Sequence, residues 1–254
     1  MSAKPKCVIV TGGANGIGKS ISIRLAEAGH SIVIADVNKD EGVSVAKQVD
    51  GMFVHSDLTD RKACKKLVEA AYKEYGSVDI LINNAGFQHI SPVSEFDEDK
   101  WEQMISLMLT APFLLTKYAW PFMKANKWGR VINVASVHAQ VASLNKVGYI
   151  SAKHGLIGLT KTAALEGGES GITVNAICPS YVRTPLVDNQ IAAQAKAHGI
   201  KEDEVIEKIM LKTIAIKHLI EPTEVAEMVR YLCSDSAKSI TGSSLNIDCG
   251  WTAQ

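Results

Sequence analysis

Residues 6–18 read KCVIVTGGANGIG, a short apolar run that ends in a turn rich in glycine. After this turn, the spacing of Ile17, Ile21 and Leu25 places apolar side chains on one face of a helix that begins at Gly16. A strand, a tight turn and a helix in this order are typical of the first unit of a parallel sheet. The segment therefore favours an α/β fold.

The rest of the chain repeats this alternation of strand and helix. The predicted strands do not alternate apolar and polar residues, which indicates that both faces of the sheet are buried. We expect a single-domain, Rossmann-type, doubly wound parallel sheet of about seven strands, with helices on both faces. Besides the first unit, we predict strands at residues 31–35, 51–55, 78–82, 129–135, 172–178 and 244–248, and helices at 61–75, 100–123, 149–166 and 221–232.

Composition excludes several classes of protein. The chain has 254 residues, of which 46% are hydrophobic, and its 27 basic side chains balance 27 acidic ones. Zero net charge argues against a nucleic-acid partner. The five cysteines are scattered without a C-x-x-C pair, so we predict reduced thiols, no disulfide framework and no metal site.

No segment predicts a membrane anchor or an export signal. Residues 1–6 lead into only four apolar residues, which is too short for the core of a signal peptide. The most apolar long window, residues 105–123, is interrupted by Pro112, Lys117 and Pro121 and is better interpreted as a buried helix. We expect a cytoplasmic protein that does not bind membranes.

One irregular stretch, residues 184–218, separates the sixth predicted strand from the next helix. It contains two short helical patterns, at 188–198 and 202–211. An insertion at this point lies over the carboxyl ends of the strands, where open α/β sheets bind ligands. We interpret it as a helical lid over a substrate.

The glycine-rich turn suits a dinucleotide. Gly12, Gly16 and Gly18 let the backbone turn tightly and approach a pyrophosphate at the start of the next helix, where Asn15 and Ile17 flank it. Asp36 ends the second strand, 20 residues after Gly16, and its carboxylate suits the ribose hydroxyls of NAD and disfavours the 2′-phosphate of NADP. The alternative is an ordinary turn followed by a solvated carboxylate.

Three other residues are spaced for proton transfer. Ser136 ends the fifth strand, and Tyr149 and Lys153 share one face of the next helix. A tyrosine is a poor base at neutral pH, and a nearby ammonium favours its ionised form. We predict that Tyr149 is the acid/base, that Ser136 orients the substrate oxygen and that Lys153 tunes Tyr149. A pair of surface residues on the helix is the alternative.

Together these motifs resemble the short-chain dehydrogenases/reductases, and the resemblance covers essentially the whole chain. It rests on the glycine turn, Asp57, the Asn83–Gly86 turn, the Ser136, Tyr149 and Lys153 set, and Pro179 followed by Thr184. It implies NAD(P)-linked oxidation of an alcohol or reduction of a ketone. The cofactor-binding residues that it implies, besides those of the glycine turn and Asp36, are Asp57, Leu58, Asn84, Ala85, Gly86, Tyr149, Lys153, Pro179, Val182 and Thr184.

The substrate segments resemble family members that interconvert (R)-3-hydroxybutyrate and acetoacetate with NAD. That resemblance implies a small carboxylate substrate. The substrate-binding residues would be Gln88, Ser136, His138, Lys146, Tyr149, Tyr181 and Gln190. Lys146 would supply the positive charge for the carboxylate. The residues that would bind the carboxylate are Gln88, His138, Lys146 and Gln190. Each of these four also has an ordinary structural interpretation, such as a loop glutamine or a buried core histidine.

Two departures from the pattern keep other functions open. Met108 stands where the family usually has an asparagine that helps hold a water near the lysine, and Ser180 and Tyr181 stand where Gly and Trp are usual. Tyr181 would admit another small polyol, sugar acid or hydroxy acid, and Met108 would suit a dinucleotide-binding protein with little turnover. The resemblance also implies a homotetramer built on the 100–123 and 149–166 helices.

Overall fold

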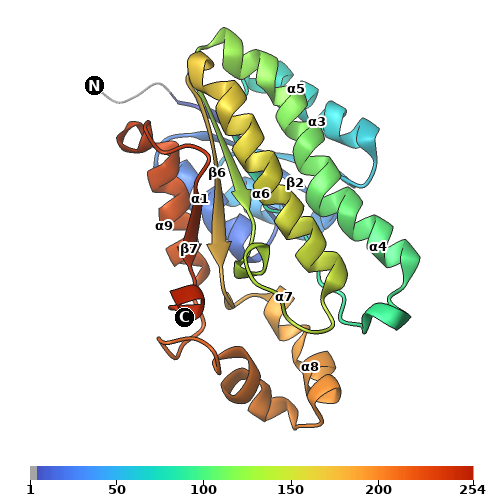
Figure 1. The fold of residues 1–254 in the computed structure, drawn as a ribbon. Coiled ribbons are helices and arrows are strands. Elements are labelled where there is room, and N and C mark those ends of the chain that lie inside the picture. Colours follow the sequence, from blue (N-terminus) through green and yellow to red (C-terminus); the bar gives the residue numbers. More distant parts are fainter. Residues whose placement is uncertain (1–4, 254) are drawn as a thin grey trace.

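The computed structural model describes residues 5–253 and contains a seven-stranded sheet in which neighbouring strands run parallel (Figure 1). The strand order is β3-β2-β1-β4-β5-β6-β7, which confirms the predicted doubly wound α/β class. Residues 1–4, part of the segment considered as an export signal, lie outside the described residues. The strands are β1 (Cys7–Thr11), β2 (Ser31–Asp36), β3 (Met52–His55), β4 (Ile80–Asn83), β5 (Gly129–Val134), β6 (Ile172–Pro179) and β7 (Ser244–Ile247).

Helices cover both faces of the sheet, and a large hydrophobic cluster lies under each layer. One layer contains α1 (Gly16–Glu27), α2 (Lys39–Gln48) and α9 (Pro222–Cys233). The other contains α3 (Arg61–Tyr75), α5 (Ala111–Ala125) and α6 (Val147–Gly167). Because helices shield both faces, every residue of β1, β4, β5 and β6 is buried, which explains why these strands lack an alternating pattern.

The long helix predicted at 100–123 is interrupted in the structure. Helix α4 (Glu98–Ile105) is followed by a wider π-helical turn at Ser106–Thr110, in which the Ala111 amide donates to the Ser106 carbonyl, and then by α5. Pro112 lacks the amide that would bond the carbonyl four residues earlier, and the π turn accommodates this loss. The turn carries Met108.

The sequence analysis missed α2 and simplified the segment at 184–218. Asn38 caps α2 by accepting a hydrogen bond from the Glu41 amide, a signal that the sequence did contain. The expected helix at 188–198 is two helices, α7 (Pro185–Asp188) and α8 (Ile191–His198). The expected helix at 202–211 is a 3₁₀ turn, Glu202–Glu204, followed by a π-helical turn, Ile206–Met210.

The segment at 184–218 lies at the carboxyl edge of the sheet, where β6 points toward α7 (Figure 1). Its Val187, Val205 and Met210 belong to a small hydrophobic cluster, to which Tyr181 and Leu219 outside the segment also contribute. Strands β1 and β4 are neighbours in this sheet although they are not consecutive, and such a switch in strand order is where open α/β sheets bind ligands. The fold thus places residues 184–218 next to the carboxyl ends of the strands, where the binding site is expected.

Two expectations, that the chain has no membrane span and no metal site, can be compared with the residues that the structure describes. Among residues 5–253, no helix is long and apolar enough to cross a membrane. In the same range, no group of three or more His, Cys, Asp or Glu side chains is arranged to hold a metal ion.

Candidate active site

The turn after β1 has the geometry that an anionic ligand needs. Gly12 and Gly16 adopt positive φ angles of 61° and 52°, which glycine adopts without steric cost. Asn15 precedes α1 without capping it through its side chain, and the first turn of α1 has no acidic residue. The amides at the start of α1 therefore remain available to a pyrophosphate.

Hydrogen bonds hold this turn against the end of β4. The Asn84 side-chain amide donates to the carbonyls of Thr11, at 2.9 Å, and Gly12, at 3.0 Å. The Thr11 hydroxyl accepts from the amides of Asn84 and Ala85 and donates to Ile82. Gly18 lies so close that an added Cβ would be 2.1 Å from the Gly12 oxygen. Gly18 thus acts through packing and does not line the cavity.

The cavity above this turn, of about 390 Å³, is lined by eleven of the residues expected to bind the cofactor. Its Asp36 carboxylate accepts hydrogen bonds from the amides of Ala14 and Asn38, at 3.1 and 2.9 Å, and is fixed at the rim. The lining, all of it within the described range, includes no lysine or arginine. The expected residues present are Gly12, Asn15, Gly16, Ile17, Asp36, Asp57, Leu58, Asn84, Ala85, Gly86 and Thr184.

Asp57 also has the ordinary turn role that the sequence left open. Its carboxylate accepts from the Thr59 amide and hydroxyl, at 3.0 and 2.7 Å, while Leu58 is buried beside it. Asn15 donates to Glu41 at the surface. These residues shape the rim whether or not a ligand is bound.

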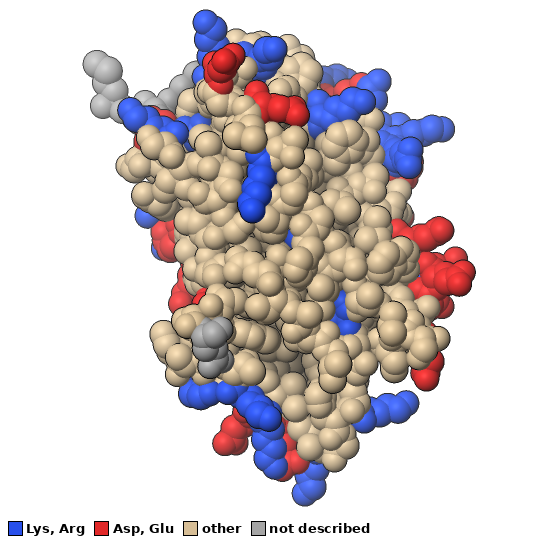
Figure 2. Space-filling view, viewed as in Figure 1, with Lys and Arg blue, Asp and Glu red and all other residues tan. Residues whose placement is uncertain are grey.

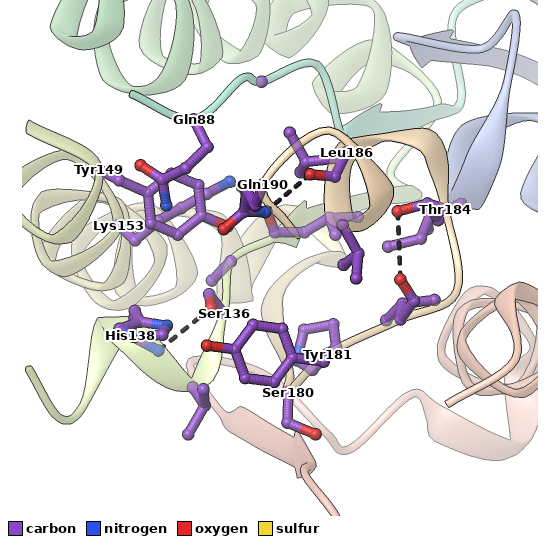
Figure 3. Close-up of a pocket in the computed structure, with 18 of the residues that line it drawn as sticks. Gln88, Ser136, His138, Tyr149, Lys153, Ser180, Tyr181, Thr184, Leu186 and Gln190 are labelled. Carbon is purple, nitrogen blue, oxygen red and sulfur yellow. Dashed lines mark hydrogen bonds between the residues drawn. The ribbon is translucent and has the colours of Figure 1, made fainter. Parts of the chain in front are cut away.

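A second, smaller cavity of about 100 Å³ contains the residues expected to do chemistry (Figure 3). Ser136, Tyr149 and Lys153 all line it, which rules out the interpretation as a surface pair. The Ser136 hydroxyl accepts from the His138 amide at 3.1 Å. The Lys153 ammonium donates to the Val134 carbonyl at 2.7 Å.

Burial dominates the titration of these groups. It raises the pKa of Tyr149 to about 12, against which the hydrogen bond to Ser136 acts, and it lowers the pKa of Lys153 to about 8. In this structure Lys153 is not among the groups that shift the pKa of Tyr149, so the expected effect of Lys153 on Tyr149 stays a prediction. The Lys153 ammonium is directed to Val134 and lies 5.5 Å from the centroid of the Tyr149 ring.

A buried cation faces the same cavity. Lys146 precedes α6 and is only 3% exposed, so it is not a solvated cap residue. Burial lowers the pKa of its ammonium to about 8. Burial, followed by Lys146 and His154, lowers the pKa of His138 to about 3, so that this imidazole stays neutral. His138 Nε2 lies 2.8 Å from the Ser143 hydroxyl.

The remaining expected substrate residues line this cavity too, but their polar groups differ in availability. The Oε1 atom of Gln88 accepts from the His89 amide, which leaves its amino group available. The Gln190 amino group instead donates to the Leu186 carbonyl at 2.7 Å, and its Oε1 atom is buried without a partner. One N–H of Gln190 is therefore engaged within the protein, and one remains.

The two cavities adjoin. Ile17, Asn84, Gly86, Thr184 and Leu186 line both of them, so they form one continuous cleft. The last group of expected cofactor residues lies at this junction and on the smaller cavity. This group is Pro179, Val182 and Thr184.

The sequence analysis did not include Trp251 in the site. Its ring lies 5.5 Å from that of His138 and 5.6 Å from that of Tyr181, between centroids, and it lines the smaller cavity. The Asp248 carboxylate fixes the turn by accepting from the amides of Gly250 and Thr252. An aspartate two residues before the glycine was the available signal.

The departures at Met108 and Ser180 have clear positions. Met108 is 1% exposed and packs in a cluster with Met104, Phe87 and Tyr149, so an apolar side chain stands behind the phenol. The Ser180 hydroxyl points away from the ring of Tyr181 and from the middle of the cavity (Figure 3). Of Ser180 and Tyr181, it is therefore Tyr181 that directs a hydroxyl toward the cavity.

Comparisons with known proteins agree on the family. A family model described as short chain dehydrogenase matches residues 6–195. A D-beta-hydroxybutyrate dehydrogenase of Rhizobium meliloti (strain 1021) is 42% identical, with 98% of this chain and 99% of the relative covered. The uncharacterized oxidoreductase YxjF of Bacillus subtilis (strain 168) is 41% identical, with 99% and 100% covered. A crystal structure of an actinorhodin polyketide ketoreductase variant with NADPH superposes with a TM-score of 0.95 at 29% identity, and both chains are covered completely.

The chain therefore belongs to the short-chain dehydrogenase family. It is an oxidoreductase, and its Rossmann fold binds a nicotinamide dinucleotide. The cleft fits that cofactor, because the free amides of α1 and the close approach at Gly18 form a cradle for a pyrophosphate.

Replacing Gly18 with alanine tests this cradle. The new Cβ would lie 2.1 Å from the Gly12 oxygen and 2.6 Å from the Asn84 Nδ2 atom, so the turn must shift. We expect NADH to bind at least tenfold more weakly, measured by titration of its fluorescence. The matched control is Gly158→Ala, where an added Cβ meets nothing within 4 Å and binding stays within twofold. Equal binding by both variants would contradict the cradle.

Proposed function

We propose that this protein is an NAD-dependent dehydrogenase that interconverts (R)-3-hydroxybutyrate and acetoacetate. The observation that carries the proposal is the buried Lys146 ammonium in the same small cavity as Ser136 and Tyr149. A short hydroxy acid has little apolar surface, so a charge on its carboxylate must orient it. The similarity to D-beta-hydroxybutyrate dehydrogenases supports the same substrate.

Asp36 supports NAD as the cofactor. Its carboxylate is held by two backbone amides at the rim of the larger cavity, where it suits ribose hydroxyls and repels a 2′-phosphate. No cation among the lining residues would compensate a phosphate. The ketoreductase with NADPH shares the fold but does not decide the cofactor of this chain.

The chain's residues divide the chemistry as follows. When bound, the nicotinamide ring exchanges a hydride with the substrate carbon that bears the oxygen. Tyr149 gives a proton to that oxygen during reduction and removes it during oxidation, and Ser136 holds the oxygen beside the phenol. Lys153 holds the nicotinamide ribose, and Lys146, with Gln88 and His138, binds the substrate carboxylate. Because burial raises the pKa of Tyr149 to about 12, the phenol carries its proton at neutral pH, and this is the form that ketone reduction requires.

The proposed enzyme is a cytoplasmic homotetramer. All five cysteines are free thiols, which suits a reducing compartment. Figure 2 shows that the face formed by α5 and α6 carries few charged side chains, with most charges at its margins. These helices also expose Phe113, by 48%, and Leu165, by 86%. Light scattering that gives a monomer in solution would contradict the assembly.

The function is tested by following NADH formation with (R)-3-hydroxybutyrate, with the (S)-enantiomer as a control and NADP in place of NAD. We expect activity with the (R)-acid and NAD only. Asp36→Ser should lower the preference for NAD over NADP by at least tenfold, because it removes the repelling carboxylate. Activity confined to other small hydroxy acids, sugar acids or polyols would contradict the substrate. Binding of NADH without turnover of any of them would favour a dinucleotide-binding protein.

Titration of Lys146 gives a second test. Burial lowers its pKa to about 8, so the ammonium is charged below that pH and neutral above it. The KM for acetoacetate should therefore rise about tenfold between pH 7 and pH 9. Lys146→Met should have a high KM at pH 7 that no longer rises in this way. A KM that rises equally in both proteins would assign the titration to Lys153 instead.

A further inference from the structure

The Tyr181 hydroxyl contacts the cation that we assign to the substrate. Lys146 Nζ donates to Tyr181 Oη at 3.3 Å, and both side chains are buried. The same ammonium lies 5.3 Å from the centroid of the Tyr181 ring. The two polar groups therefore reach the same corner of the smaller cavity, which both residues line.

Packing fixes the Tyr181 ring in this place. The ring stacks on Trp251, with centroids 5.6 Å apart and an angle of 29° between planes. Trp251 in turn meets the His138 ring edge to face. In Figure 3 the hydroxyl end of Tyr181 points toward the side of the cavity where His138 and Ser136 lie. Its hydroxyl is held at the cavity and does not point to solvent.

The hydrogen bond with Lys146 leaves Tyr181 a donor. An ammonium has no lone pair, so the Tyr181 oxygen accepts and keeps its own proton for another partner. Burial raises the pKa of this phenol to about 12, so the proton stays on it at neutral pH. A carboxylate, which only accepts hydrogen bonds, matches an O–H donor beside an ammonium.

The Gln190 side-chain amide is partly engaged within the protein. The bond from its amino group to the Leu186 carbonyl fixes the orientation of the amide, since a carbonyl partner requires an N–H donor. The other end of the amide is a buried oxygen without a partner. Gln190 thus keeps one N–H donor, whereas the Tyr181 O–H is a donor that lies directly beside the Lys146 ammonium.

We propose that the Tyr181 hydroxyl binds the substrate carboxylate together with Lys146. The inference rests on the proposed function in assigning the carboxylate to this cavity. It makes Tyr181 a specificity-determining residue, which selects short acids over neutral alcohols and ketones of the same size.

The test compares butyrate with butyramide, which have the same size but differ in charge and lack the reacting hydroxyl. Their dissociation constants are measured by calorimetry on the protein saturated with NADH. Tyr181→Phe removes only the hydroxyl, and we expect it to weaken butyrate roughly tenfold and butyramide less than twofold. Tyr231→Phe, at an exposed tyrosine on α9, is the matched control and should change neither constant.

Three results would overturn the assignment. Equal weakening of both probes by Tyr181→Phe would show a packing role, and no weakening would show that the hydroxyl is not a ligand. A loss of butyrate binding in Gln190→Met that matches or exceeds the loss in Tyr181→Phe would return the role to Gln190. The two proposals can also fail separately. If the unaltered protein does not oxidise (R)-3-hydroxybutyrate, but Tyr181→Phe still weakens butyrate and not butyramide, the proposed substrate is wrong and the Tyr181 assignment stands.

Discussion

The hydrogen bonds between the turn after β1 and the end of β4 are the constraint on which the cleft depends. Thr11 and Asn84 join two strands that are adjacent in the sheet but more than 70 residues apart in the chain. These bonds fix the backbone of the turn, so that Gly18 packs against it and α1 starts in a defined direction. Because the strands are parallel, their carboxyl ends meet at one edge, and the larger cavity forms there.

Desolvation is the second physical theme of the site. Lys153 and Lys146 are buried and Tyr149 is half-buried, and desolvation shifts each pKa so that the neutral form of the group is favoured. An uncharged lysine is less costly to bury, but it cannot attract a carboxylate. With a pKa of about 8, Lys146 still carries its charge at neutral pH, and an anion bound beside it would offset the cost of burying that charge. This is the physical basis on which we propose that a cavity of about 100 Å³ selects a small acid.

Much of this arrangement could be predicted from the sequence. The strand order class, the glycine turn, Asp36 and the set of Ser136, Tyr149 and Lys153 follow from local patterns whose chemistry is specific. What the sequence did not reveal depends on tertiary contacts. The π turn at Ser106–Thr110 and the direction of the Lys153 ammonium toward Val134 are such cases. The same holds for the Gln190 amide, whose orientation is set by a carbonyl that sequence spacing does not single out.

The central claim is that Tyr149 transfers the proton, while most of the contacts that hold the dinucleotide come from other residues of the cleft. The most direct measurement is the single-turnover rate of Tyr149→Phe with saturating NAD and (R)-3-hydroxybutyrate, alongside the dissociation constant of NADH. We predict a rate at least a hundredfold lower, as expected for the loss of a general acid/base, with NADH binding within threefold of the unaltered protein. A rate close to that of the unaltered protein would contradict the account.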